Sequence, residues 1–217
     1  MKSGKGLWDR TASLPSFGLL PALVLRFKGP LRESGWFRTV RRGISMDASG
    51  DPIPWLSYGA TNLLEERVRP EMRVFEYGCG NSTLWWSKRA VQVVSCEHDK
   101  AWYDKVRAVA PGNVQLLYVP LDGTGQYART VAEQGCAFNV IVIDGRDRAA
   151  CALHAESALT PTGVIVWDDT DREGYREGCA RLREAGFRVL TFSGFGPVSV
   201  VRHETSILYR PGNCLGI

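Results

Sequence analysis

A short segment between an apolar run and a helix-forming run holds an acid and two glycines. Residues 76–80 read Glu-Tyr-Gly-Cys-Gly and follow Val74 and Phe75. Glycines in such a turn let the chain bend sharply and bring bare backbone against a ligand. The hydroxyl of Ser82 or Thr83 can cap the helix that follows, which leaves its N-terminal amides facing the same ligand. The segment is therefore predicted to hold a small molecule against its backbone.

A second acid indicates what that molecule is. Glu97 closes the next apolar run, residues 91–97, where a carboxylate accepts hydrogen bonds from both hydroxyls of a ribose. Glu76 lies two residues before Gly78, where a carboxylate can meet the cationic methionine portion of S-adenosylmethionine. A dinucleotide is the main alternative ligand, although such sites usually have a third glycine where Thr83 stands, and Glu76 would repel a pyrophosphate. Aminopropyl transfer is a further alternative.

Three aspartates follow two other apolar runs, Asp144 after residues 140–143 and the pair Asp168 and Asp169 after residues 164–167. If these runs are neighbouring strands, the carboxylates converge and repel unless they are protonated, hydrogen-bonded or neutralised by a cation. Mg²⁺ suits oxygen ligands and could orient a substrate hydroxyl and lower its pKa. Asp144, Asp168 and Asp169 are therefore predicted metal ligands, and Asp144 is also a predicted catalytic residue. Helix capping is the near-equal alternative.

The chain has three histidines, and His203 is the best candidate for a general base. It lies in the loop before the last apolar run, which the expected topology places at the same edge as the acids. Imidazole titrates near neutral pH. An exposed loop histidine is the alternative interpretation. His98 is expected to border the cofactor, and His154 is expected to pack within a helix.

Apolar runs and helix-like segments alternate along the chain, which predicts a parallel sheet with helices on both faces. The loop 193–203 has no helical pattern, so the last two strands are expected to form an antiparallel hairpin. Ligands of such sheets bind outside the carboxyl ends of the strands. The predicted strands are 73–77, 91–97, 114–119, 138–144, 163–168, 187–192 and 205–209. The predicted helices are 61–68, 83–90, 101–109, 127–134, 149–159 and 175–185.

The sequence Glu-Tyr-Gly-Cys-Gly-Asn-Ser-Thr of residues 76–83, with Glu-His-Asp at 97–99, resembles the class I S-adenosylmethionine-dependent methyltransferases. Its Gly-Asn-Ser-Thr ending resembles a bacterial subgroup called FkbM-like. Over about residues 55–210 the expected order of strands and helices is similar to that of this family. The resemblance implies an α/β Rossmann-like sheet of seven strands with a C-terminal antiparallel hairpin. It also places Asp122 near the adenine. The residues expected to contact the cofactor are Glu76, Gly78, Gly80, Asn81, Ser82, Glu97, His98, Asp122 and Asp144.

The strand-end aspartates resemble those of Mg²⁺-dependent O-methyltransferases of the macrocin and catechol types. The catechol enzymes place a catalytic lysine one turn after the first aspartate, where this chain has Asp147, so that base does not carry over. The resemblance implies methyl transfer to a hydroxyl of a small acceptor, either sugar-containing or another natural product. The alternative is a non-catalytic module of the same fold that docks a partner or a membrane.

The chain has 217 residues, enough for one domain with an extension. We expect a basic helical extension or lid over residues 1–50 and the methyltransferase domain over residues 51–217. Residues 1–50 carry nine Lys and Arg against three Asp and Glu, and the remainder carries 18 against 20. Such a basic amphipathic segment can lie on an anionic membrane or on the domain as a solvated face.

Other features of composition limit the partners and the compartment. The six cysteines lack metal-binding spacing and suit a reducing compartment, so a cytoplasmic location is expected. The apolar run 17–25 is interrupted by Pro21 and is too short to span a bilayer. The sequence has no stripe of alternating basic and aromatic residues of the kind that indicates nucleic-acid binding, so no nucleic-acid partner is expected. A homo-oligomer is compatible with the sequence.

Overall fold

The computed structural model describes Val24 and residues 27–217. The sequence predictions for the apolar run 17–25 and for the first half of the basic extension therefore lie largely outside the described residues. Among the residues described, no helix is long and apolar enough to cross a membrane.

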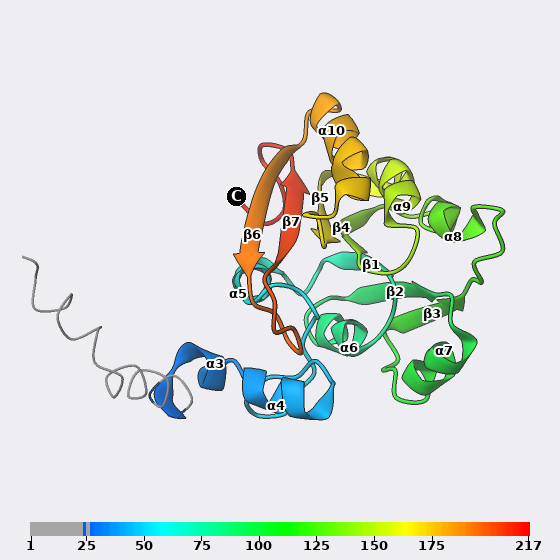
Figure 1. The fold of residues 1–217 in the computed structure, drawn as a ribbon. Helices are drawn as coiled ribbons and strands as arrows, with labels where there is room; N and C mark the ends of the chain where they lie inside the picture. The colour runs from blue at the N-terminus through cyan, green and yellow to red at the C-terminus, as the bar shows by residue number, and fades with distance from the viewer. Residues whose placement is uncertain (1–23, 25–26) are drawn as a thin grey trace, which may run out of the picture.

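The centre of the molecule is a sheet of seven strands in the order β3-β2-β1-β4-β5-β7-β6. Strands β1 to β5 pair in parallel, and β7 runs antiparallel to both β5 and β6. This confirms the predicted parallel sheet that ends in an antiparallel hairpin (Figure 1). The strands are β1 (Arg73–Tyr77), β2 (Gln92–Glu97), β3 (Val114–Tyr118), β4 (Phe138–Ile143), β5 (Leu159–Asp168), β6 (Arg188–Gly194) and β7 (His203–Tyr209).

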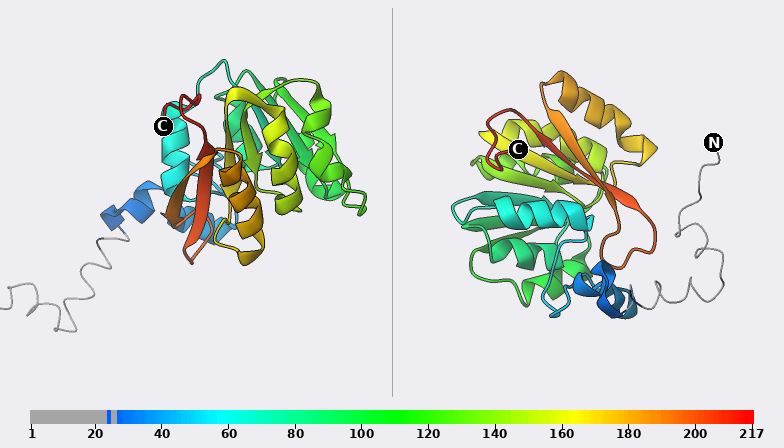
Figure 2. Two further views of the ribbon diagram at one scale, coloured as in Figure 1. Left: turned by 90° about the horizontal axis from the view of Figure 1, so that it is seen from above. Right: turned by 90° about the vertical axis from the view of Figure 1, so that its left-hand side faces the viewer.

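Helices cover both faces of the sheet, as Figure 2 shows. One core packs aromatic and aliphatic side chains of the strands, such as Phe75 and Ile141, against the helices between β3 and β6. The other packs the alternate strand residues, such as Val74 and Val142, against Trp85 and Trp86. The helices are α3 (Pro30–Glu33), α4 (Trp36–Arg42), α5 (Tyr58–Arg67), α6 (Asn81–Ser87), α7 (Lys100–Arg107), α8 (Gln126–Arg129), α9 (Arg148–Ala155) and α10 (Arg176–Glu184).

The observed elements differ from the predicted ones mainly at their ends. Strand β5 begins at Leu159, four residues before the predicted start, and its pairing with β4 shifts register between Phe138 and Val140. The predicted helix 127–134 is α8 followed by a short 3-10 turn, Ala132–Gln134. His203, expected in a loop, is the first residue of β7. None of these shifts alters the order of the strands.

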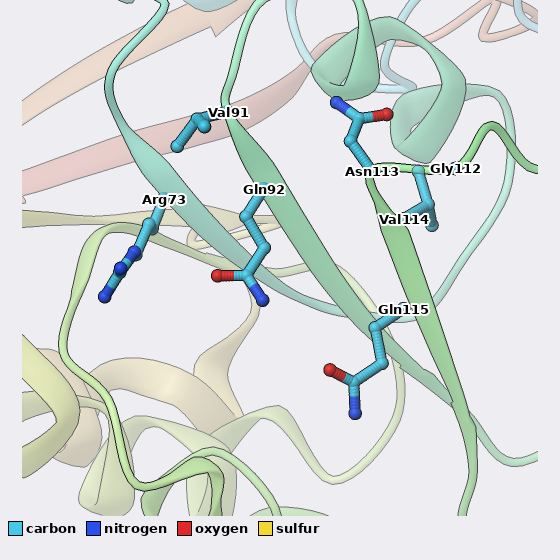
Figure 3. Close-up of a pocket in the computed structure, with 7 residues that line it drawn as sticks. All are labelled: Arg73, Val91, Gln92, Gly112, Asn113, Val114 and Gln115. Atoms are coloured by element: carbon cyan, nitrogen blue, oxygen red, sulfur yellow. The ribbon is translucent and has the colours of Figure 1, made fainter.

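A hollow of about 480 Å³ opens at the amino ends of β1, β2 and β3. Figure 3 shows Arg73, Gln92 and Gln115, one from each strand, among the side chains that line it. Because ligands of such sheets bind at the carboxyl ends of the strands, this hollow is at the wrong edge for the predicted cofactor. The candidate site is therefore built at the opposite edge.

Candidate active site

The turn after β1 depends on Gly78. Its backbone has φ +86°, a left-handed conformation that only glycine adopts without strain. A Cβ atom there would lie 3.0 Å from the Cα of Gly145, so β1 and the segment after β4 touch through bare backbone. Gly80 differs, because its φ of 165° is extended and an added Cβ would meet Trp102 at an ordinary 3.7 Å. The turn itself therefore requires glycine at position 78 alone.

Glu76 is completely buried on β1. Its Oε2 accepts hydrogen bonds from Thr83 Oγ1 at 2.5 Å and from Ser95 Oγ at 2.9 Å. Its Oε1 is buried and has no hydrogen-bond partner. Burial raises the pKa of Glu76 to about 7, against the opposing effect of the hydroxyls of Ser82, Thr83 and Ser95. An unpartnered oxygen of this kind is costly, and a ligand that donates a hydrogen bond would remove the cost.

Glu97 lies at the end of β2 and joins the two loops of this edge. Its Oε2 accepts from the backbone N–H of Cys79 at 3.1 Å, and its Oε1 accepts from the N–H groups of His98 and Asp99, both at 2.8 Å. A carboxylate has about four acceptor positions, and the three N–H groups occupy three of them, so one remains for a ribose hydroxyl. The ring of His98 is also close, with Nδ1 2.7 Å from Glu97 Oε1. Glu76, Gly78, Gly80, Glu97 and His98 are thus brought together as predicted.

Two further predicted cofactor residues, Asn81 and Asp122, have other partners. Asn81 Nδ2 donates to the carbonyl of Ser45 at 2.5 Å, so the side chain of Asn81 contacts the N-terminal segment. Asp122, predicted near the adenine, is exposed and accepts hydrogen bonds from Thr124 within the loop after β3. No contact joins Asp122 to the glycine turn, and its role stays a prediction.

The sequence places Trp85, Trp86 and Trp102 in helical segments that should cover the sheet, which favours core packing for all three, and for Trp102 this is wrong. Its side chain is 46% exposed, and its Nε1 donates to the carbonyl of Cys79 at 2.6 Å. The indole therefore fixes the peptide between Cys79 and Gly80. Trp85 and Trp86 are buried as expected.

The three strand-end aspartates do converge, but around an arginine. Arg148, at the start of α9, has a guanidinium nitrogen 2.8 Å from Asp144 Oδ1 and another 3.0 Å from Asp169 Oδ2. The second nitrogen also lies 3.6 Å from Asp168 Oδ2 and donates to the Asp168 carbonyl at 2.7 Å. Arg148 is itself buried. The cation that neutralises these acids is therefore part of the chain.

The residues present do not fit the predicted magnesium ion. Asp144, Asp168 and Asp169 direct their oxygens at the Arg148 guanidinium, and Asp169 also pairs with Arg172 at 2.6 Å. Within residues 27–217 no group of three or more acidic, histidine or cysteine side chains is arranged to hold a metal. The sequence also allows Asp169 or Asp171 to cap the helix that starts near Glu173, and this alternative is wrong, because the turn that begins at Glu173 has no side-chain cap.

Burial raises the pKa values of Asp144 and Asp168 above those of ordinary aspartates. Burial, together with the neighbouring Asp168 carboxylate, raises the pKa of Asp144 well above its ordinary value, although Arg148 opposes the shift. Burial and Asp169 raise the pKa of Asp168 to about 6, against the effects of Thr205 and Arg148. Asp168, which changes protonation near neutral pH at the carboxyl edge of the sheet, is a candidate for proton transfer.

His203 is buried, at 8% exposure, which contradicts the alternative of an exposed loop histidine. Its Nε2 lies 3.8 Å from Asp168 Oδ1, and neither ring nitrogen has a hydrogen-bond partner. Asp168 Oδ1 accepts a hydrogen bond from Thr205 Oγ1 at 2.6 Å, and that hydroxyl accepts from the N–H of Ser57 at 2.9 Å. The hairpin, the connector and the acidic cluster therefore meet at this point.

Sequence reasoning missed Ser95, Trp102 and Arg148. Ser95 had a readable signal, because a serine inside an otherwise apolar strand (Val-Val-Ser-Cys over 93–96) must find a buried partner. Arg148 lay next to the aspartate that replaces the lysine of the catechol enzymes. Sequence reasoning gave it no role.

No family model matches the chain, and no curated protein matches it. Solved structures do match. The O-methyltransferase TomG from Streptomyces achromogenes, in complex with SAM, is 18% identical with a TM-score of 0.57, over 88% of this chain and 96% of TomG. Precorrin 8W decarboxylase from Methanobacterium thermoautotrophicum is 17% identical with a TM-score of 0.57, over 78% of this chain and 97% of that one.

Spermidine synthase from Thermotoga maritima is also similar, at 15% identity and a TM-score of 0.52, over 69% of this chain and 56% of the synthase. Identities this low establish the fold alone. The sheet, its hairpin and these similarities together define an α/β Rossmann-like methyltransferase fold.

Proposed function

We propose that this chain binds S-adenosylmethionine and transfers its methyl group to a hydroxyl of a small acceptor. The observation that carries the proposal is Glu76, a buried carboxylate with one unpartnered oxygen beside a left-handed glycine turn. Glu97, one strand away in the sheet, supplies the acceptor for ribose hydroxyls. When bound, the cofactor supplies a methyl group on a cationic sulfur.

The chain's own residues then have distinct tasks. Glu76 accepts from the amino group of the ligand, and Glu97 with the Cys79 amide fixes the nucleoside end. Gly78 keeps side-chain atoms out of the turn, and Trp102 holds the carbonyl of Cys79 in place. His98, Asn81, Ser82 and Asp122 are the remaining proposed cofactor residues.

His203 is the proposed base that removes the acceptor proton. It is buried, its nitrogens have no partner, and Asp168 lies near enough to stabilise the imidazolium that forms. Asp144 is proposed to lie beside the cofactor, held by Arg148. The choice of oxygen over nitrogen as methyl acceptor is supported by the Ile-Asp-Gly ending of β4 at 143–145, which lacks the Asn-Pro-Pro-Tyr sequence used for exocyclic amines.

Calorimetry with S-adenosylmethionine, S-adenosylhomocysteine and NAD⁺ tests the proposal directly. We expect both sulfur nucleosides to bind and NAD⁺ to bind at least 100-fold more weakly, because Glu76 repels a pyrophosphate. Decarboxylated S-adenosylmethionine serves as the probe for aminopropyl transfer. A chain that binds none of the sulfur nucleosides is a non-catalytic module, and the proposal is then wrong.

Release of S-adenosylhomocysteine in the presence of sugar-bearing hydroxyl acceptors tests the reaction itself. His203→Gln should reduce the turnover rate by about 100-fold and leave cofactor affinity unchanged. Because the acids surround Arg148, activity is expected to survive EDTA. Loss of activity that Mg²⁺ restores would show that a metal acts there after all.

A further inference from the structure

A second surface lies beside the candidate site, made of α3, α4 and the loop of residues 195–202 that joins β6 to β7. We call it the basic face. Figures 1 and 2 both show the two blue helices next to the orange loop. Two hydrogen bonds join them, from Trp36 Nε1 to the Ser199 carbonyl and from the Val198 amide to Thr39 Oγ1, each 2.8 Å long. Helices and loop therefore form one continuous surface.

Arginines without acidic partners dominate this face. A hollow of about 640 Å³ is lined by Arg32, Arg38 and Arg41, together with apolar side chains that include Phe37 and Val40. All three arginines are exposed, and none forms an ion pair within the described part of the chain, whereas Arg172 and Arg181 pair with neighbouring acids. Together α3 and α4 carry four arginines and one acid, Glu33, and a merely solvated helix face would be expected to mix the two signs of charge more evenly.

Large apolar side chains are exposed on the same elements. Val200 and Val201 of the loop are each 66% exposed, Phe195 and Val40 are 45% and 39% exposed, and Ile44, just after α4, is 48% exposed. The loop 195–202 contains Arg202 and no acid. Exposed aliphatic residues beside unpaired arginines are typical of surfaces that lie in the interface of a bilayer.

We propose that the basic face binds an anionic phospholipid bilayer, with Arg32, Arg38 and Arg41 on lipid phosphates and the two loop valines in the boundary between headgroups and acyl chains. Arginine pairs bidentately with phosphate, and the positive charge complements a negative membrane surface. A single-stranded nucleic acid fits less well, because its bases stack on aromatic platforms and the most exposed apolar side chains of the loop, Val200 and Val201, are aliphatic. The proposal does not depend on the reaction proposed above.

Vesicle flotation of the full chain tests the proposal. The chain should bind vesicles of phosphatidylcholine mixed with phosphatidylglycerol and should not bind phosphatidylcholine alone, and added salt should weaken the binding. Arg38→Glu with Arg41→Glu should reduce partitioning at least about 20-fold. Val200→Ser with Val201→Ser should reduce it about tenfold through lost apolar burial.

The matched control is the double variant Arg183→Glu with Arg188→Glu. Arg183 lies on α10 and Arg188 is the first residue of β6, and both are exposed. This variant changes the net charge by the same amount as the double variant of the basic face. It should leave partitioning within about twofold of the unmodified chain. If charge reversal lowers the melting temperature, Arg38→Gln and Arg41→Gln should still each cost about fivefold. The proposal is overturned by equal binding to neutral vesicles, by equal loss in the control pair, or by no loss in the valine pair. Displacement of the vesicles by inorganic phosphate would likewise overturn it, in favour of a site for a soluble anion.

Discussion

The two halves of the carboxyl edge use their acids in opposite ways. On the β1–β2 side, Glu76 has protein partners for one oxygen and none for the other. On the β4–β5 side, Asp144 and Asp169 both pair with Arg148, so their cationic partner is a side chain of the same protein. A carboxylate that is left partly unsatisfied is suited to a ligand, whereas carboxylates around a buried arginine are suited to holding strands and helix together. The comparison separates a half with an unpartnered acceptor oxygen from a half whose acids already face a cation.

The largest effect is expected from Arg148→Ala, which leaves buried carboxylates without a cation. Breaking a buried ion pair from one side costs about 3–5 kcal/mol, which lowers the melting temperature by roughly 10 °C in a chain of this size. Thermal denaturation measures it, with Arg183→Ala on the surface of α10 as the control. Mg²⁺ should recover part of the loss in the variant and leave the unmodified chain unchanged. A melting temperature of the unmodified chain that rises with Mg²⁺ would contradict the assignment of Arg148.

Gly78→Ala should weaken binding of S-adenosylmethionine about 100-fold. The added methyl would be strained by the left-handed backbone and would press on the Gly145 backbone. Gly135→Ala is the matched control, because Gly135 also has a positive φ, 65°, but open space around its Cβ position. Calorimetry of both variants separates crowding at the site from simple backbone strain. Equal losses in the two variants would refute the role of the turn.

Glu76→Gln should weaken binding about 10- to 100-fold, since a charged hydrogen bond to the ligand is lost. In the unmodified chain, affinity should rise as the pH increases through about 7, where Glu76 loses its proton. In the variant that dependence should disappear. Affinity that is flat with pH in both proteins would show that Glu76 does not meet the ligand.

Glu76 should also make the stability of the chain depend on pH, but in the opposite direction to its effect on ligand affinity. The pKa of Glu76 rises from an ordinary 4.5 to about 7 in the folded chain, so only the unfolded chain ionises between those values. The free energy of unfolding without ligand therefore falls as the pH rises from about 4.5 to 7 and is then constant in this respect. Glu76→Gln removes this loss, so its advantage in melting temperature should grow over that range and be fully present above pH 7.

Trp102→Phe should have the smallest effect, about a fivefold loss of affinity. The substitution keeps an aromatic ring and removes the hydrogen bond to the Cys79 carbonyl, which is worth about 1 kcal/mol. Trp86→Phe on the buried side of the neighbouring helix is the contrast, since it should lower stability and leave affinity unchanged.

The sequence was informative where the chemistry is local in the chain. Glu76, Gly78 and the strand-end Glu97 lie within 22 residues, and strand alternation with the apolar runs predicted their common edge. The roles of Trp102 and Arg148 depend on contacts to Cys79 and Asp168, 23 and 20 positions away, which periodicity does not encode. His203 was assigned to the right edge, but its burial follows from the closing of the hairpin against Leu56 and Gly196.

The hydrogen bond from Asn81 to the Ser45 carbonyl joins the first turn of α6 to the segment just after α4. If binding of the proposed nucleoside and the proposed attachment of the N-terminal helices both alter this bond, linkage requires each to change the affinity of the other by the same factor. Titrating either one would then measure its coupling to the other.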